Sequence, residues 1–154
     1  MLSIIEAKTL EELQCAQKLF EEYAASLNFD LCFQNFAEEL ANLPGEYSPP
    51  DGCILLAWQD GESAGCVALR KLDESICEMK RLYVTPAFRG LGIGKALTEA
   101  IIAEARMKSY KKMCLDTVPS MHEAQTLYES LGFQDVQTYR HNTVCGTRFM
   151  ELTL

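Results

Sequence analysis

The sequence is poor in the residues from which metal sites and disulfides are built. Only 2 of its 154 residues are histidines, and neither His122 nor His141 has a cysteine or carboxylate partner at ligand spacing. The 7 cysteines are odd in number, lie scattered along the chain and form no C-x-x-C pair. We therefore expect reduced, mostly buried thiols and no metal site.

The chain also lacks long apolar runs and an excess of basic residues. No stretch approaches the roughly 20 apolar residues that span a membrane. The start, Met1–Lys8, has neither the basic residues nor the long apolar core of a signal peptide. The formal net charge of −8 argues against non-specific binding to nucleic acid. These absences predict a cytoplasmic protein that binds neither membranes nor nucleic acid.

The sequence does contain enough apolar residues for one compact domain over residues 1–154, since 48% of them are hydrophobic. Turn signals and apolar periodicity predict the order β-α-α-β-β-β-α-β-α-β-β, a mixed α/β (or α+β) sheet with helices on both faces. The expected strands cover 2–7, 53–58, 63–70, 77–84, 112–117, 133–139 and 145–152. The expected helices follow Thr9 and cover 33–43, 92–108 and 119–131, the last with Pro119 and Ser120 at its start.

The most informative stretch is Cys77–Lys95, which combines a strand, a turn and a glycine-rich entry into a helix. Leu82-Tyr83-Val84 ends the strand and Thr85-Pro86 stops it, because proline has no N–H for the ladder. Glycines at positions 90, 92 and 94 then leave backbone N–H groups unshielded at the positive end of a helix dipole, beside Arg89 and Lys95. This pattern predicts an anion site, with phosphate as the preferred anion.

The spacing of the glycines separates three kinds of phosphate loop. The Walker pattern G-x-x-x-x-G-K-[ST] does not fit, because only 3 residues lie between Gly90 and Gly94 and Ala96 follows Lys95. The dinucleotide pattern G-x-G-x-x-G also fails, because the chain has G-x-G-x-G. The remaining pattern, Arg89-x-x-Gly92-x-Gly94 after a strand ending in LYV, resembles the acyl-CoA loop of the GNAT superfamily of N-acyltransferases.

A second motif, Leu127–Phe133 with the sequence LYESLGF, looks like the end of the fourth helix in the same superfamily. The resemblance covers the whole chain and implies a mostly antiparallel sheet of seven strands. It also implies that the pantetheine arm of acetyl-CoA lies between two splayed central strands, and that loop N–H groups take its pyrophosphate. The implied cofactor-binding residues are Leu82, Tyr83, Val84, Arg89, Gly90, Leu91, Gly92, Ile93, Gly94 and Lys95.

The reaction needs a proton acceptor for the amine and a proton donor for the leaving thiolate. Tyr128 resembles the family's usual acid, although helical spacing also suits a core tyrosine. Glu78 stands where some protein-acetylating members keep a general base; a solvated carboxylate or a salt bridge with Lys80 is equally consistent with the sequence. Alternation along the strand places Glu78 on one face with Lys80 and Leu82.

One position departs from the family pattern. Many members carry an asparagine one helical turn before the residue that matches Ala124, where it binds the pantetheine arm, whereas this chain has Met121. A side-chain contact from position 121 is therefore in doubt. His122 lies on the same turn, where a polar lining or relay base competes with the ordinary role of an exposed helix residue.

The sequence thus predicts an N-acetyltransferase that moves acetyl from acetyl-CoA directly to a primary amine of a small molecule, peptide or protein. Direct transfer is favoured because no Cys/His pair at recognisable spacing supplies an activated thiol. Two alternatives stay open, a non-catalytic acyl-CoA-binding regulatory module and an acyltransferase for a longer acyl group. The acceptor and the general base, whether Glu78, His122 or water, are not decided by the sequence, and a homodimer stays open.

Overall fold

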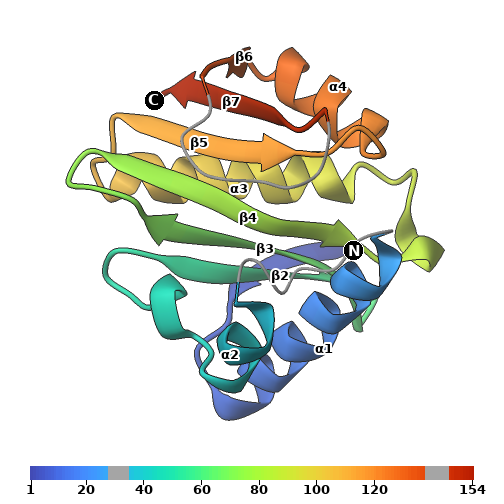
Figure 1. Ribbon diagram of the computed structural model, residues 1–154. Helices are drawn as coiled ribbons and strands as arrows, with labels where there is room; N and C mark the ends of the chain where they lie inside the picture. The colour runs from blue at the N-terminus through green and yellow to red at the C-terminus, as the bar shows by residue number, and fades with distance from the viewer. Residues whose placement is uncertain (28–34, 138–145) are drawn as a thin grey trace.

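The computed structural model describes residues 1–27, 35–137 and 146–154 (Figure 1). It contains a sheet in the order β1-β2-β3-β4-β5-β7-β6, in which only the central pair β4 and β5 is parallel. The fold class and the element order predicted from the sequence are confirmed. The strands are β1 (Leu2–Glu6), β2 (Cys53–Gln59), β3 (Glu62–Lys71), β4 (Ile76–Val84), β5 (Lys112–Thr117), β6 (Gln134–Asp135) and β7 (Arg148–Thr153).

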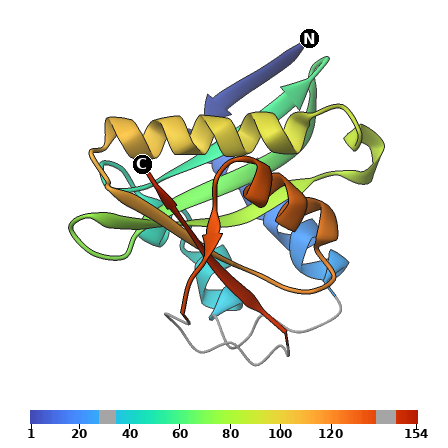
Figure 2. The same cartoon turned by 90° about the horizontal axis from the view of Figure 1, so that it is seen from above.

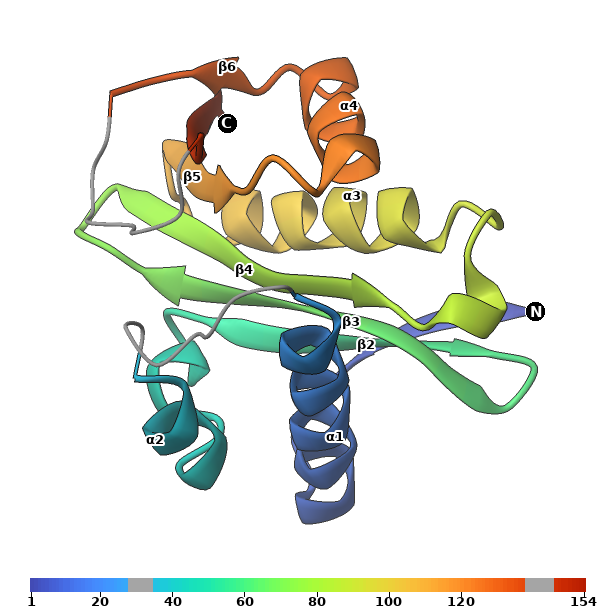
Figure 3. The ribbon, with the colours of Figure 1, turned by 45° about the vertical axis from the view of Figure 1, so that its right-hand side comes forward.

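Helices cover both faces of the sheet. Figure 2 looks from the β6 edge and separates α3 on one side from α1 and α2 on the other, and Figure 3 shows α4 on the side of α3. Each layer has its own apolar cluster, one built around Leu97 and Ile101 of α3 and one around Phe20 of α1. The helices are α1 (Leu10–Ser26), α2 (Phe36–Ala41), α3 (Ile93–Met107) and α4 (His122–Ser130), with short 3₁₀ turns η2 (Gly45–Tyr47) and η3 (Pro86–Phe88).

The start of α1 follows directly from its sequence. Thr9 Oγ1 accepts a hydrogen bond from the Glu12 N–H, and the Glu12 carboxylate accepts one from the Thr9 N–H, which completes the predicted capping box. The second predicted helix is shorter than expected, because Asn35 adopts a left-handed conformation (φ 57°) and α2 begins only at Phe36. Residues 33 and 34 of that prediction lie outside the described residues.

The two closing strands are also shorter than predicted. Within the described residues, β6 covers only Gln134–Asp135 of the range 133–139, and residues 138 and 139 lie outside the description. The last strand was predicted from 145 but begins at Arg148, because Gly146 has a φ of 81°. A β-carbon at Gly146 would stand 2.8 Å from Pro119 Cγ, so this turn depends on glycine. Position 145 and the predicted corner at His141 lie outside the described residues.

A β-bulge interrupts β4 in its centre and corrects one sequence prediction. The register between β3 and β4 shifts between Cys66 and Ala68, and opposite this shift Arg81 has a φ of 62°. Leu82 consequently packs on the α3 side, whereas Lys80 is paired with Ala68 of the α1-side cluster. The expectation that Glu78, Lys80 and Leu82 share one face is therefore wrong for Leu82, because simple alternation does not survive a bulge.

The lengths of the helices and the placement of the polar side chains bear on membranes and metals. Among the residues described, none of the helices is both long and apolar enough to cross a membrane. In the same part of the chain, histidine, cysteine and carboxylate side chains do not gather in groups of three or more that could hold a metal ion.

Candidate active site

The candidate site is the opening where the two central strands part. The pairing of β4 with β5 covers only three positions and ends at Glu78 and Cys114. Beyond that point β5 stays paired with β7, and β4 stays paired with β3 up to Val84. Figure 1 shows the two strands diverging toward the N-terminal end of α3. The half of β4 that contains Leu82 and Val84 therefore has β3 on one side and this opening on the other.

The glycine-rich loop closes one end of the opening. Gly90 and Gly92 have φ angles of 83° and 79°, a conformation that few residues other than glycine adopt, and no heavy atom lies within 4 Å of a β-carbon built at either position. Gly92 is the N-cap of α3, so the N–H groups that follow it have no partner within the helix. The loop from Arg89 to Gly92 and the side chain of Lys95 are exposed. The loop has the open, positively polarised surface that an anion requires.

The side chain of Arg89 is held by the end of β4. Its Nε donates to the Val84 carbonyl at 3.0 Å, and its guanidinium carbon lies 5.7 Å from the centre of the Tyr83 ring. Its own N–H donates weakly to the Pro86 carbonyl, at 3.4 Å. The side chain of Arg89 thus ties the loop to the end of β4.

Ionisable side chains from four elements interact electrostatically around Asp116 of β5. Burial raises the pKa of the Tyr128 phenol on α4, and negative charge on Tyr23 of α1 and on Asp116 of β5 raises it further. Burial also raises the pKa of Tyr23 to about 12, a shift that Arg81 opposes and Asp116 reinforces. Asp116 is the common partner in this group, because its charge acts on Tyr23, on Lys80 and on Tyr128.

Lys80 is the cation of this group. Its side chain is 9% exposed, and burial lowers the pKa of its ammonium to about 7. The neighbouring positive charge of Arg81 lowers this pKa further, and the negative charge of Asp116 opposes both effects. Lys80 is therefore divided between its charged and neutral forms near neutral pH.

Glu78 lies deeper, on the same strand. It is fully buried, and its carboxylate accepts a hydrogen bond from Arg70 Nε of β3 at 2.6 Å. Arg70 in turn donates through Nη1 to Glu46, which is exposed, at 2.5 Å. A buried ion pair holds the carboxylate in one orientation. Protonation of Glu78 would therefore weaken its attraction to Arg70. A role as general base stays a prediction.

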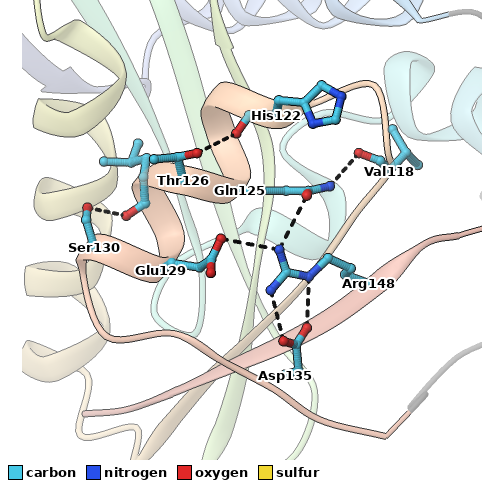
Figure 4. Close-up of polar contacts among 9 residues, drawn as sticks. Val118, His122, Gln125, Thr126, Glu129, Ser130, Asp135 and Arg148 are labelled. Carbon is cyan, nitrogen blue, oxygen red and sulfur yellow. Dashed lines mark hydrogen bonds and ion pairs between the residues drawn. The ribbon is translucent and has the colours of Figure 1, made fainter.

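Tyr128 lies on the short helix α4 and is held in place by the packing of its ring. It is 5% exposed, and its ring centre lies 5.6 Å from that of Phe133. The helix itself is fastened by Arg148 of β7, whose guanidinium binds both carboxylate oxygens of Asp135 at 2.9 Å and also donates to Gln125 and Glu129 of α4 (Figure 4). Arg148 thus joins α4, the helix that contains Tyr128, to the last two strands.

The two residues that the sequence left undecided stand where α4 begins, with Met121 as the N-cap and His122 as the first helical residue. The helix thus begins later than the predicted start at Pro119, because Met121 still has a non-helical backbone conformation. The Met121 sulfur accepts a long hydrogen bond from Thr117 Oγ1 at 3.9 Å, so its side chain turns toward the end of β5. His122 is exposed, and only its backbone carbonyl takes part in the contacts of Figure 4, where it accepts from Thr126. The contacts of Met121 and His122 are those of ordinary residues at the start of a helix. A relay role for His122 stays untested.

The thiols nearest the opening are poor nucleophiles. Cys77 and Cys114 are buried, and burial raises their pKa values to about 12 and about 11. A thiol reacts as its thiolate, which is scarce at neutral pH when the pKa is this high. The five cysteines described, at positions 15, 53, 66, 77 and 114, are all free, as the sequence predicts, and Cys32 and Cys145 lie outside the described residues.

Reasoning from the sequence missed Lys80, Asp116 and Tyr23. Two consecutive charges in the middle of the apolar strand C-E-M-K-R-L-Y-V, at Lys80 and Arg81, were a usable signal, because charged residues are seldom buried without a reason. Asp116 closes an apolar strand in the same way. No comparable signal existed for Tyr23, which fits the apolar stripe of α1 as well as any core residue.

Comparison with known proteins identifies the family. The profile of the acetyltransferase (GNAT) domain matches residues 50–135. An uncharacterized N-acetyltransferase from Schizosaccharomyces pombe is 38% identical over 99% of this chain and 95% of its own length. The chain therefore belongs to the GNAT acetyltransferases and is an acyltransferase, of a family whose acyl donor is acetyl-CoA.

More distant relatives and solved structures agree with this assignment. Human N-acetylaspartate synthetase is 34% identical over 70% of this chain, which spans only 36% of that protein. An acetyltransferase structure from Streptococcus agalactiae superposes with a TM-score of 0.81 over 99% of this chain and 98% of its own, at 19% identity. A Salmonella typhimurium structure described with its cofactor acetyl-CoA superposes with a TM-score of 0.70, over 99% and 93% of the two chains, at 19% identity. Identities this low show a shared fold.

Proposed function

We propose that this protein transfers acetyl from acetyl-CoA directly to a primary amine, in a complex that holds both substrates at once. The observation that carries the proposal is the opening between β4 and β5, with the glycine loop at one end and the buried Tyr128 phenol within electrostatic reach of Asp116 on the diverging strand β5. The loop N–H groups from Arg89 to Lys95 would bind the pyrophosphate, and backbone groups of Leu82 and Val84 would bind the pantetheine and acyl carbonyl. The protonated state of Cys77 and Cys114 supports transfer without a covalent enzyme intermediate.

The electrostatics define what Tyr128 can contribute. A thiol has an ordinary pKa of about 8.5, well below that of a phenol whose pKa is raised above about 10. Complete proton transfer from Tyr128 to the leaving thiolate is therefore uphill. A hydrogen bond from the phenol to the sulfur, strengthened as negative charge develops there, is the contribution that this pKa allows.

The acceptor can be sought by measuring thiol release from acetyl-CoA with a panel of amines, amino acids and peptides. The name of the relative N-acetylaspartate synthetase makes aspartate the first acceptor to assay. Turnover with any primary amine, and an acetamide product identified by mass spectrometry, would support the proposal. Tight binding of acetyl-CoA without turnover on any acceptor would favour the regulatory module instead, and faster transfer from a longer acyl-CoA would favour the third alternative.

Substitution of Gly92 tests the glycine loop. Asparagine and aspartate both tolerate the left-handed conformation of this N-cap, so Gly92→Asn and Gly92→Asp differ mainly by one charge. We expect acetyl-CoA at a hundred times its dissociation constant to stabilise the wild-type protein by about 2.7 kcal/mol. Gly92→Asn should retain most of this stabilisation. Gly92→Asp should lose it, because like charges about 4 Å apart repel by about 4 kcal/mol near a protein surface.

Melting temperatures with and without acetyl-CoA measure this effect, and pantetheine without the pyrophosphate serves as the ligand control. Without ligand, Gly92→Asp should melt no lower than Gly92→Asn, because a carboxylate at a helix N-terminus is favourable. Equal ligand-induced shifts in the two variants would show that the phosphate binds elsewhere.

Substitution of Glu78 tests the general base. If Glu78 takes the proton, kcat/KM should rise through one ionisation and level off, and Glu78→Gln should lower the plateau and remove that ionisation. An alkylamine, with a pKa of about 10, needs the base, whereas an aromatic amine is already neutral. Glu78→Gln should therefore cost much less on the aromatic amine.

The ion pair with Arg70 requires a control, because Glu78→Gln also removes a buried charge beside it. Glu46→Gln removes the other carboxylate of the same arginine and leaves Glu78 in place. Equal losses for Glu78→Gln on both kinds of amine, or the same loss for Glu46→Gln, would make Glu78 a structural partner of Arg70. In that case water or His122 handles the proton.

A further inference from the structure

The C-terminal end of α1 lies over the part of β4 that borders the opening. The helix packs against β3 and β4, and Figures 1 and 3 show its last turn beside the end of β4. Leu82 and Val84 pack on the α3 side of the sheet, whereas Tyr83 between them belongs to the apolar cluster on the α1 side. The ring of Tyr23 in the last turn of α1 meets the Tyr83 ring edge to face, with centres 6.2 Å apart.

The phenol of Tyr23 has no hydrogen-bond partner among the described residues. Tyr23 is half-buried, whereas Tyr47 in the same apolar cluster is 1% exposed and its phenol oxygen is fully enclosed. A phenol carries one O–H donor and an oxygen that accepts. The oxygen of Tyr23 is therefore available to a ligand at the edge of the opening, on the face opposite α3.

The phenols of Tyr23 and Tyr128 interact from opposite faces of the sheet. Tyr128 lies on α4 and belongs to the apolar cluster on the α3 side. Burial raises the pKa of its phenol, and negative charge on Tyr23 raises that pKa further. Because the pairing of β4 with β5 ends at Glu78 and Cys114, no continuous ladder separates the two faces beyond that point.

Tyr23 is a neutral hydrogen-bonding group near neutral pH. Burial raises its pKa to about 12, a shift that Arg81 opposes and Asp116 reinforces. A phenol with this pKa keeps its own proton and is a poor base toward an amine. Its oxygen can still accept a hydrogen bond from an N–H group.

A primary amine keeps one N–H throughout acetyl transfer. Its nitrogen lone pair forms a bond to the acyl carbon, while the C–S bond breaks and its electron pair leaves on the sulfur. One amine proton passes to the general base, and the second N–H remains in the amide product. An N-methyl amine has a single N–H, which it loses to the base, so it has none left to donate to a second partner.

We propose that Tyr23 binds the acceptor: its phenol oxygen accepts the N–H that the attacking nitrogen keeps, and this contact selects primary amines over N-methylated amines. The inference rests on the proposed function, which places the thioester beside Leu82 and Val84, with the glycine loop at the start of α3. The acceptor then approaches from the other face, under the end of α1. Tyr83 is a positioning residue, because its ring holds the ring of Tyr23.

The test compares a primary amine with its N-methyl derivative as acceptor, such as aspartate with N-methylaspartate and benzylamine with N-methylbenzylamine. The measured quantity is the ratio of kcat/KM values within each pair. The wild-type enzyme should prefer the primary amine. Tyr23→Phe should narrow this preference about 3- to 10-fold, the effect of one neutral hydrogen bond. A role of Tyr23 in packing alone would lower both rates alike and leave the ratio unchanged.

Tyr47→Phe is the matched control, because Tyr47 lies in the same apolar cluster with its ring edge to face on Phe20 and its oxygen enclosed. It should leave the ratio unchanged. Tyr83→Leu should narrow the ratio about as much as Tyr23→Phe, because the Tyr23 ring then loses its support. The double variant should narrow it no further, since both changes remove the same contact. Any effect of Tyr83→Leu on acetyl-CoA is shared by both amines and cancels in the ratio.

The outcomes separate this inference from the function on which it rests. A preference that survives in Tyr23→Phe, or one that Tyr47→Phe narrows equally, would overturn the role of Tyr23 and leave the acetyltransferase intact. Failure to acetylate any amine would overturn the proposed function. Calorimetry of the same amines with the CoA-loaded protein then decides the site. Binding that Tyr23→Phe weakens would retain it, and equal binding by wild type and variant, or no binding, would overturn it as well.

Discussion

Tyr128→Phe should lower kcat by about 10²- to 10³-fold, the usual cost of removing one hydrogen-bond donor to a charge that develops during the reaction. The substitution removes only the hydroxyl, so the ring of residue 128 should keep its contact with Phe133 and the fold should survive. The acetyl-CoA-induced rise in melting temperature should be unchanged, because the proposed hydrogen bond from the phenol strengthens only during the reaction and not on binding. Steady-state thiol release with a good acceptor measures the effect.

Tyr110→Phe is the matched control. Tyr110 is also a buried tyrosine, and its hydroxyl donates to the Asp51 carbonyl at 2.7 Å, far from the opening. The Tyr110→Phe variant should lose stability but keep most of its activity. A loss of less than about threefold in Tyr128→Phe would reduce Tyr128 to a packing residue.

Ionisation of Tyr128 should not affect kcat on the alkaline side of its pH profile. An ordinary phenol begins to ionise near pH 10, whereas burial raises the pKa of Tyr128 above that value. Wild-type kcat should therefore show no fall toward pH 10, and the difference between wild type and Tyr128→Phe should stay constant across that range.

Local signals in the sequence were sufficient for the order of the elements and for the backbone of the glycine loop. Thr9 and Glu12 determine the start of α1 through contacts only three residues apart, and Gly90 and Gly92 supply the positive φ angles that the loop requires. The motif at Leu127 placed Tyr128 on a helix that ends beside the central strands. Such features depend on neighbours in the chain, which a single sequence displays.

The contacts of the site depend on register instead, which the sequence does not display. Glu78 meets Arg70 because these residues stand opposite each other in the β3–β4 ladder. Lys80 and Arg81 share one face only because a bulge lies opposite Val67. A shift of one residue reverses every side chain that follows, so the same charges would have been assigned to the wrong layer.

Loss of the ion pair between Arg81 and Glu39 should have the second large effect, a decrease in stability. Both side chains are well buried, and the pair joins α2 to the bulge of β4. Arg81→Met would leave the Glu39 carboxylate without its two hydrogen bonds in a buried place. We therefore expect Arg81→Met to lower the free energy of unfolding by about 3–5 kcal/mol, measured by urea denaturation.

The double variant Arg81→Met/Glu39→Met distinguishes an uncompensated charge from lost packing. Replacing both partners by apolar residues of similar length removes the buried charge as well as the bond, so most of the lost stability should return. Glu39→Met alone should also be destabilising, because it removes the carboxylate that binds the guanidinium of Arg81 at two points. If the double variant is as unstable as the sum of the two single variants, the pair does not act as a unit, and the bulge depends on the shape of the arginine rather than on its charge.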